Sequence, residues 1–441
     1  MTADHLTNLI TFVTTDFAGI TRGRAIAAAD WQPDMRKSMG WVPANMSLTP
    51  FDIIADPNPW GSTGDLRLLG DDGAHFQVDL PGSATPLDLI MADIVELDGR
   101  PWALCPRSLL KSALADLERE AGITLIASFE HEFQVFGADW AVAPAFSLQA
   151  LRRADPFGPA VMGALQAAGL QPEVFIAEYG RDQFEVPIAP APALIAADRA
   201  VVLREIVREL ARNRGWRASF APKTAVEGVS NGVHIHLSFQ DAQGKPIAYD
   251  ATQPAGVSNI AGAFVAGIMR HMSALVAFTA PSPISYLRLK PHHWSSSYTW
   301  FGDRDREASL RICPIPTITG ADPARAFNIE YRPADATACP HLALAVLVRA
   351  GLEGIRANLS TPPLFSGDPE QLTTEARDKL GLHRLPLTLD AALEALLTDT
   401  AVLSWFDPML VETYVGMKRM EMHLAGADLN DALCQRYAGI Y

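Results

Sequence analysis

Acidic side chains and histidines recur at alternating positions in two short segments, and together they could bind divalent cations. Glu130 and Glu132 flank His131, and His234 and His236 alternate in the same way. Because residues two apart in a strand project from the same face, each pair would converge on one side of a sheet. Carboxylate oxygens with an imidazole suit Mg²⁺ or Mn²⁺ better than a structural zinc ion.

Further carboxylates could join this group through a turn and another strand. Glu178 and Glu185 would face opposite ways in one continuous strand, but a turn at 180–182 could return both to one site. Glu330 alternates with Arg332 in a further strand-like run. Taken alone, each of these segments also fits an ordinary surface strand or hairpin. Together, they predict an oxygen-rich cation site.

Arginines near these carboxylates indicate chemistry on phosphate groups. A charged run at 303–311 contains Arg306 and Arg311, although such a run is also typical of a solvated loop. Arginine binds phosphate or carboxylate with paired hydrogen bonds. The sequence contains neither a Walker-type P-loop nor a Rossmann glycine pattern. We therefore expect phosphoryl transfer by charge neutralisation and alignment, with the nucleotide held in another way.

The elements that must position these residues divide the chain into two predicted domains. Residues 1–105 contain short strand-like runs, including 9–14 and 76–80, broken by Pro, Gly and Asp. A helix is predicted to begin with Ser108 as its N-cap and to end at Gly122. Residues 106–441 form the second, mixed domain, with helices predicted at 197–214, 259–278 and 340–358. The expected fold class is α+β.

Composition excludes several other functions. The chain has 441 residues and a formal net charge of −14, which opposes binding to nucleic acid. Its four cysteines are widely spaced, so we expect reduced, mostly buried thiols. The first residues do not resemble a signal peptide, and we expect no apolar run to approach the ~18 residues that a membrane span needs. We expect a cytoplasmic protein with no membrane partner.

The order and spacing of the motifs resemble the glutamine synthetase family from about Pro106 to the C-terminus. The similar pieces, in chain order, are Phe-Glu-His-Glu-Phe at 129–133, Glu178 with Gln-Phe-Glu at 183–185, Ala-Pro-Lys at 221–223, His-Ile-His at 234–236, Arg-Glu-Ala-Ser-Leu-Arg at 306–311, and Ile-Glu-Tyr-Arg-Pro-Ala-Asp at 329–335. This resemblance implies a β-grasp-like N-terminal domain and a large catalytic domain with a curved, mainly antiparallel sheet surrounded by helices.

The resemblance also implies roles for individual residues. One metal ion would be bound by Glu132, Glu178 and Glu185, and a second by Glu130, His234 and Glu330. The other matched positions are, for the nucleotide, Lys223, His236, Ser238 and Arg311; for phosphate transfer, Arg306 and Arg311; and for substrate carboxylates, Arg288 and Arg332.

In the family reaction, ATP phosphorylates the γ-carboxylate of glutamate and an amine attacks the acyl phosphate. The resemblance therefore implies ATP, glutamate or a related acid, an amine and two or more Mg²⁺ or Mn²⁺ ions per site. It further implies a homo-oligomer of stacked rings, such as a dodecamer, with active sites between subunits.

The sequence departs from the family at the ammonium site. Trp294 stands where a glutamate of the flap closes that site, with His293 beside it, and 45–49 replaces the motif whose aspartate completes the site. An indole suits an organic amine better than ammonium, through apolar and cation–π contact. We therefore expect a γ-glutamyl-amine ligase of the polyamine or monoamine branch.

Other departures concern the acid and the nucleotide. Val229 and Ser230 replace an Asn-Gly pair, which leaves another carboxylic acid open, and Asn328 stands where an ATP-contacting arginine is common. Two alternative functions remain: an authentic glutamine synthetase that uses ammonium, and a catalytically silent relative with a structural or regulatory role.

Overall fold

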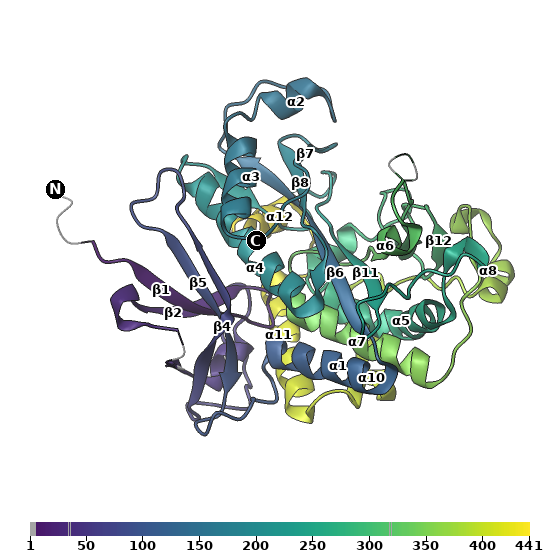
Figure 1. Ribbon diagram of the computed structural model, residues 1–441, viewed down its shortest axis with the longest axis horizontal. Coiled ribbons are helices and arrows are strands. Elements are labelled where there is room, and N and C mark those ends of the chain that lie inside the picture. Colours follow the sequence, from purple (N-terminus) through teal and green to yellow (C-terminus); the bar gives the residue numbers. More distant parts are fainter. Residues whose placement is uncertain (1–5, 34, 36, 317, 319) are drawn as a thin grey trace.

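Two separate sheets organise the chain in the computed structural model, which describes residues 6–33, 35, 37–316, 318 and 320–441 (Figure 1). The first sheet has the strand order β2-β1-β5-β4-β3, in which only the β1–β5 pair is parallel among the strands described. Its strands are β1 (Leu9–Thr15), β2 (Thr21–Ala27), β3 (Ser38–Trp41), β4 (Leu66–Val78) and β5 (Leu87–Val95).

The second sheet has the order β12-β13-β14-β11-β6-β8-β7, with β9 and β10 also paired to β6. Apart from the parallel β12–β13 pair, its described pairs are antiparallel. The strands are β6 (Thr124–Phe136), β7 (Ile176–Ala177), β8 (Gln183–Pro187), β9 (Ala191–Pro192), β10 (Arg217–Ser219), β11 (Val233–Gln240), β12 (Phe301–Asp303), β13 (Leu310–Ile312) and β14 (Ile329–Tyr331).

Helices cover one side of this second sheet, where α4 packs on β6 and α1 and α5 pack on α7 (Figure 1). The α+β class and the mainly antiparallel second sheet are thus confirmed. The helices are α1 (Pro106–Ala121), α2 (Leu148–Arg152), α3 (Phe157–Ala167), α4 (Ala193–Arg212), α5 (Asn259–Thr279), α6 (Pro323–Ala326), α7 (Pro340–Arg356), α8 (Thr374–Leu380), α9 (Leu389–Thr398), α10 (Thr400–Leu403), α11 (Pro408–Ala425) and α12 (Asp431–Ala438).

The first helix begins earlier than its sequence pattern indicated. Pro106 opens α1 and Cys105 is the N-cap, so the assignment of Ser108 as N-cap was wrong. Proline favours the first helical position because its fixed φ matches the helix and its missing N–H is not needed there. The predicted end is confirmed, since Gly122 caps the helix in the left-handed region at φ 65°.

The apolar helix α5 corrects the expectation that no segment was long and apolar enough to span a membrane. Asn259–Thr279 passes that test by length and composition, with a mean hydropathy of 1.5. However, 72% of its apolar window is buried inside the protein, and it packs against α7 and α9. Gly267 and Gly354 lie so close together that an added Cβ on either would meet the backbone of the other helix. Helix α5 is therefore a core helix of the folded protein.

The other sequence expectations on buried groups agree with the structure. All four cysteines lie in the described part of the chain and are free, buried thiols. The hydrophobic core extends from the first sheet through the helices of the second without interruption. The domain division between residues 105 and 106 stays a prediction.

Candidate active site

One face of the second sheet collects the predicted acidic and histidine side chains. In the register of the antiparallel pairs, His234 lies opposite Glu130, and Glu185 lies opposite Glu132. Glu330 lies opposite His236 on the next strand. Directly opposed residues share a face, and so do residues two apart, so β6, β8, β11 and β14 all present these side chains to the same side.

The other face of β6 belongs to the core, as the alternation predicted. Phe129, His131 and Phe133 are each about 1% exposed or less. The His131 ring packs edge-on against Phe220, with ring centroids 6.0 Å apart. Burial, reinforced by the nearby charge of Arg204, lowers the pKa of His131 well below its usual value. This histidine is therefore a neutral core residue.

A hairpin brings Glu178 to the same region as Glu185, which confirms the predicted turn. Strands β7 and β8 pair antiparallel, and the backbone N–H of Glu178 donates to the carbonyl of Gln183 at 2.9 Å. Asp182 adopts a left-handed φ of 55° within the turn. Because the chain reverses at this turn, the two carboxylates lie in the same region despite their seven-residue spacing.

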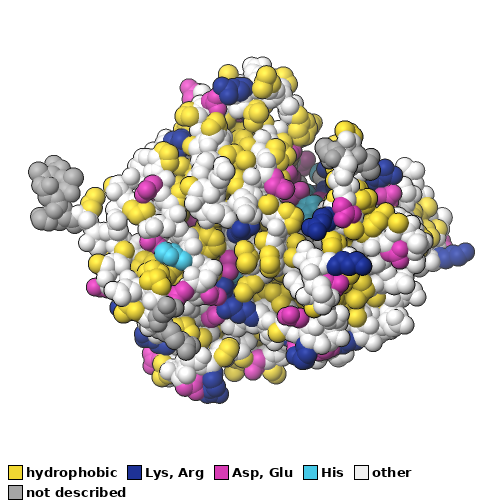
Figure 2. Space-filling model, in the orientation of Figure 1, with side chains coloured by type: hydrophobic (Ala, Val, Ile, Leu, Met, Phe, Trp, Pro, Cys, Tyr) yellow, Lys and Arg dark blue, Asp and Glu magenta, His cyan; other side chains and the backbone are white. Residues whose placement is uncertain are grey.

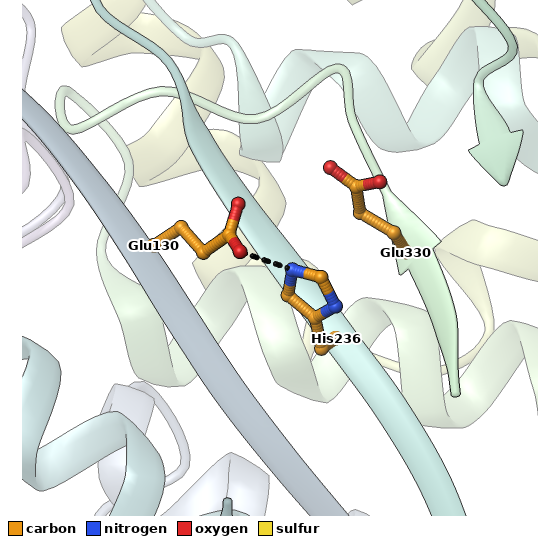
Figure 3. Close-up of side chains that lie close together, drawn as sticks. All are labelled: Glu130, His236 and Glu330. Atoms are coloured by element: carbon orange, nitrogen blue, oxygen red, sulfur yellow. Dashed lines mark ion pairs between the residues drawn. The ribbon is translucent and has the colours of Figure 1, made fainter. Parts of the chain in front are cut away.

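The centre of the site is a contact between two carboxylates and two imidazoles. Figure 3 shows both carboxylates and one of the imidazoles, that of His236. His234 Nδ1 lies 3.3 Å from both Glu130 Oε2 and Glu330 Oε1. His236 Nε2 lies 3.1 Å from Glu130 Oε1. One ligand atom from each of Glu130, His236 and Glu330 lies within 4.8 Å of the others. The three come from β6, β11 and β14, and Figure 3 shows their functional groups gathered on one side of the sheet.

Arginines compensate the charge in this half of the site. Glu330 is 1% exposed, and its carboxylate accepts a hydrogen bond from Arg311 Nη1 at 2.8 Å and pairs with Arg332. Burial alone would raise the pKa of Glu330, but the charges of His234 and Arg332 outweigh it and lower the pKa to about 2. Burial also acts to raise the pKa of Glu130, but its ion pairs with His234 and His236 hold this pKa well below the usual value.

The other half of the site has an excess of negative charge. Burial, with repulsion from Glu130, Glu132, Glu178 and Glu330, raises the pKa of Glu185 to about 9. Burial raises the pKa of Glu132 to about 7, although its carboxylate accepts a hydrogen bond from the N–H of Gly232 at 2.5 Å. Burial likewise raises the pKa of Glu178.

This excess charge fits divalent cations. Carboxylates crowded in a partly buried place remain ionised at neutral pH only when positive charge lies beside them, and oxygen donors are the ligands that Mg²⁺ and Mn²⁺ prefer. In Figure 2 the surface is hollowed between the regions of β7 and α6, and acidic, basic and histidine side chains gather there. The donor set can therefore be reached from solvent.

The other predicted site residues differ in their hydrogen-bond partners and in their exposure. Arg288 is 2% exposed and donates to the carbonyls of Arg332 and Pro333, both at 2.9 Å. Arg306 is exposed, and its charge acts on Glu178. Lys223 is buried with its ammonium on the carbonyl of Gly228. The hydroxyl of Ser238 donates to the carbonyl of Phe327 at 2.9 Å. Lys223, Ser238 and Arg288 thus bond to backbone carbonyls, and the charges of Arg288 and Arg306 also act on Glu132 and Glu178.

The segment that carries Trp294 is tied to the same site by its backbone. Trp294 is 68% exposed, and its carbonyl accepts a hydrogen bond from Arg332 Nη2 at 3.0 Å. Arg332 in turn pairs with Glu330. The side chain of His293, in the same segment, is exposed. Its partial desolvation, together with the charges of Lys223 and Lys290, lowers its pKa. Arg332 therefore links the backbone of Trp294 to the carboxylate of Glu330.

Three supporting residues were missed by the sequence reading. Glu307 accepts hydrogen bonds from the backbone N–H groups of His292 and Trp294, both at 3.1 Å. Arg384 donates to the carbonyls of Ser297 and, at 3.4 Å, Leu289. The Sγ of Cys313 lies 3.7 Å from Glu330 Oε2. The alternation of Arg311 and Cys313 was a signal for the last of these, whereas side-chain bonds to loop backbone leave no periodic pattern.

Comparison with known protein families defines the class. Residues 103–437 match the glutamine synthetase catalytic domain, and residues 2–102 match the glutamine synthetase N-terminal domain. The chain therefore belongs to the glutamine synthetase family of ATP-dependent ligases.

Individual members of that family are similar to the chain over most of its length. The chain is 35% identical to a gamma-glutamylpolyamine synthetase of Streptomyces coelicolor, over 91% of this chain and 87% of the relative. It is 29% identical to the glutamine synthetase of Pyrococcus woesei, over 90% and 87%. A solved crystal structure, described as a novel glutamine synthase homolog, matches all of both chains with 45% identity and a TM-score of 0.91.

Proposed function

We propose that this protein is an ATP-dependent ligase that joins the γ-carboxylate of glutamate to an organic amine. One observation carries the proposal: the flap position that holds a glutamate in ammonium-using relatives carries the exposed Trp294, whose backbone carbonyl accepts a hydrogen bond from Arg332, the partner of Glu330. The similarity to a gamma-glutamylpolyamine synthetase supports the same class of substrate.

The physical reason lies in what each side chain can do for the amine. A carboxylate binds ammonium by charge and can accept its proton, whereas an indole offers an apolar face of high polarisability. Such a face stabilises the hydrocarbon part of an amine, and it attracts a protonated amino group through cation–π contact worth about 0.5–1 kcal/mol at an exposed site. The exchange of Glu for Trp therefore favours larger amines.

The carboxylate face supports the phosphoryl-transfer half of the reaction. We infer that Mg²⁺ or Mn²⁺ ions bind there, through Glu132, Glu178 and Glu185 on one side and Glu130, His234 and Glu330 on the other. Bound divalent cations would neutralise and align the phosphates of ATP. Arg306 and Arg311 border these carboxylates and can stabilise charge on the transferred group.

The proposed reaction has two balanced steps. An oxygen of the γ-carboxylate of glutamate attacks the γ-phosphorus of ATP, and ADP leaves. The amine nitrogen then attacks the acyl carbon, inorganic phosphate leaves, and the nitrogen releases one proton to give the γ-glutamyl amide. We assign the substrate carboxylates to Arg288 and Arg332 because the family resemblance implies this role, and we propose that the acid is glutamate although Val229 and Ser230 depart from the family.

Phosphate release with a panel of amines tests the proposal. The purified protein, with ATP, Mg²⁺ and glutamate, should release phosphate faster with at least one monoamine or polyamine than with ammonium at equal concentration. Release with ammonium alone would identify an authentic glutamine synthetase. If Mg²⁺ and ATP together produce no thermal shift, the protein is a catalytically silent relative.

Exchange of the flap residue tests the assignment of the amine site. Trp294→Glu should raise the ratio of ammonium to amine kcat/KM by about 10-fold or more, since one carboxylate restores charge at the amine site. Trp294→Phe keeps an aromatic face and is the matched control, which should retain the amine preference. An unchanged ratio in Trp294→Glu would show that another residue selects the amine.

The assembly and the location follow from the same family membership. We propose a homo-oligomer of stacked rings in which the site is completed by a neighbouring subunit, and a cytoplasmic enzyme with neither a membrane nor a nucleic acid as partner.

A further inference from the structure

A buried nitrogen of His236 has no hydrogen-bond partner among the described residues. This atom, Nε2, is shielded from solvent and lies 3.1 Å from Glu130 Oε1, but in a geometry that makes no hydrogen bond. Burial of a polar atom without a hydrogen-bond partner is unfavourable. The ion pair with Glu130 is therefore the contact that compensates the buried Nε2 among the described residues, and a bound cation could take the place of the proton in that pair.

The orientation is fixed from the other side of the ring. His236 Nδ1 lies 2.8 Å from Asn328 Oδ1. The amide of Asn328 cannot be turned around without loss, because its Nδ2 donates to the carbonyl of Ala326 at 3.1 Å. The oxygen of Asn328 must then accept, so Nδ1 is the ring nitrogen that carries the donated hydrogen. Nε2 is thereby the ring nitrogen that faces the carboxylates of Glu130 and Glu330.

We propose that His236 is a ligand of the divalent cation bound by Glu130 and Glu330, and that Asn328 is the positioning residue that orients it. The inference rests on the proposed function only in assuming that the carboxylate face binds cations. It changes the role of His236, which the family pattern places beside the nucleotide.

The spacing of the donors fits one hexacoordinate ion. Ligand atoms at about 2.1 Å from Mg²⁺ lie about 3.0 Å apart when adjacent and about 4.2 Å apart when opposite. One atom each of Glu130, His236 and Glu330 already lies within 4.8 Å of the others. The three side chains therefore need only small rotations to enclose a cation.

The arrangement of the ring is typical of a metal-bound histidine. Such histidines usually donate their second ring nitrogen to a carbonyl or carboxylate, which fixes the tautomer and raises the basicity of the ligating nitrogen. Asn328 supplies that acceptor at a position where the family commonly has an arginine, whose guanidinium has donors only. The substitution thus creates the acceptor that a metal-binding His236 requires.

Mn²⁺ binding to the intact, nucleotide-free protein tests the proposal directly. Free Mn²⁺ is measured by its electron paramagnetic resonance signal during titration. His236→Phe keeps the ring volume and removes both nitrogens, and it should weaken Mn²⁺ binding about 10- to 100-fold. The nitrogen-14 coupling of the bound Mn²⁺ should decrease by one imidazole nitrogen.

Variants at Asn328 separate orientation from direct ligation. Asn328→Leu has a similar shape without an acceptor and should weaken Mn²⁺ binding about 10-fold or more. Asn328→Asp keeps the acceptor and should remain within a few-fold of the native protein. Gln240→Ala, on the same face of β11, is the matched control and should leave the affinity unchanged.

The outcomes distinguish this inference from the proposed function. If the native protein binds no Mn²⁺, the cation site itself is wrong. If the native protein and His236→Phe bind Mn²⁺ equally, with the same nitrogen-14 coupling, and only ATP affinity falls in the variant, His236 is a nucleotide residue and the inference is overturned. Equal affinities of Asn328→Leu and Asn328→Asp would overturn the role of Asn328.

Discussion

Charge is distributed unequally between the two groups of carboxylates on the sheet. Glu330 and Glu130 lie beside arginine or histidine groups, which hold their pKa values low despite burial. Glu185 and Glu132 have pKa values raised to about 9 and about 7, chiefly by burial. The first group is therefore ionised in the cation-free protein, whereas the second carries bound protons that an entering cation must displace.

This difference predicts opposite effects of two amide substitutions. Glu185→Gln resembles the protonated acid already present, so it should leave the melting temperature of the cation-free protein unchanged or higher and lower kcat about 100-fold or more. Glu330→Gln should also abolish activity, but it leaves Arg311 and Arg332 without a buried counter-charge and should lower stability. Thermal melting with EDTA measures the contrast, and equal melting temperatures for the two variants would contradict it.

The pKa of Glu185 also predicts how stability depends on pH. This group ionises near 4.5 in the unfolded chain and near 9 in the folded protein. Between these pH values the folded state binds more protons than the unfolded state. The contribution of Glu185 to stability is therefore fully present below pH 4.5, and it is lost as the pH rises through about 9.

Melting curves from pH 6 to 9 check the sign of this dependence. Without cations the melting temperature should fall as pH rises, and Glu185→Gln should reduce that fall. Added Mg²⁺ should raise the melting temperature more at pH 9 than at pH 6, because fewer protons must then be displaced. A Mg²⁺ effect that is larger at pH 6 would contradict the assignment.

At the level of residues, the sequence predicted which side chains share a face but not how they contact one another. The alternation of Glu130, Glu132, His234 and His236 follows from strand geometry alone. The contacts of His234 with Glu330 and of His236 with Asn328 join segments almost a hundred residues apart. Such contacts are set by tertiary packing, which a local pattern does not contain.

Among the elements, the flap that carries Trp294 is held by contacts from outside it. Its residues 292 and 294 both have left-handed φ values, of 62° and 52°, and both N–H groups donate to Glu307. Arg384 bonds to the carbonyls of Leu289 and Ser297, which lie at the two ends of the segment. The position of the indole is therefore set by two side chains that need not touch the amine.

Loss of the Glu307 carboxylate should affect amine use before phosphoryl transfer. Glu307→Ala removes both acceptors from a strained backbone, so the flap should relax and the KM for the amine should rise about 10-fold. Glu307→Gln keeps one acceptor oxygen and should recover part of the affinity. Steady-state kinetics measure both, and a loss confined to the KM for ATP would show that Glu307 acts elsewhere.

The elements themselves were predicted unevenly. The three long helices and the 178–185 hairpin follow from apolar periodicity and a turn signal, and the structure has them within a few residues. The start of α1 was misplaced because Ser108 is a good N-cap by type, while Pro106 already fixes the first turn. The order of the strands in the second sheet could not be predicted from local patterns. Strands β7 and β8 are neighbours in the sequence and pair at the edge of the sheet, whereas β6 and β11 pair although about a hundred residues separate them.

At the level of the whole molecule, the N-terminal sheet provides the argument for assembly. Residues 45–49, the stretch that we propose to replace the family's ammonium-site motif, lie in and after a short 3-10 helix (Pro43–Ser47) that packs against α11 of the same chain. In the proposed ring, this segment would complete the carboxylate site of a neighbouring subunit. This segment would then complete the active site of the neighbouring subunit and not the site of its own chain.

The proposed rings predict a large mass and an activity that depends on assembly. Each subunit has a mass of 47.7 kDa, so a dodecamer would have a mass of about 570 kDa, measurable by light scattering. Specific activity per subunit should fall on dilution as the mass falls, because an isolated carboxylate face would lack the segment contributed by its neighbour. Mg²⁺ and ATP should slow that dissociation if they bind at the shared site. An active 47.7 kDa monomer would contradict the shared site, and it would require the amine pocket to be formed by the Trp294 flap of the same chain alone.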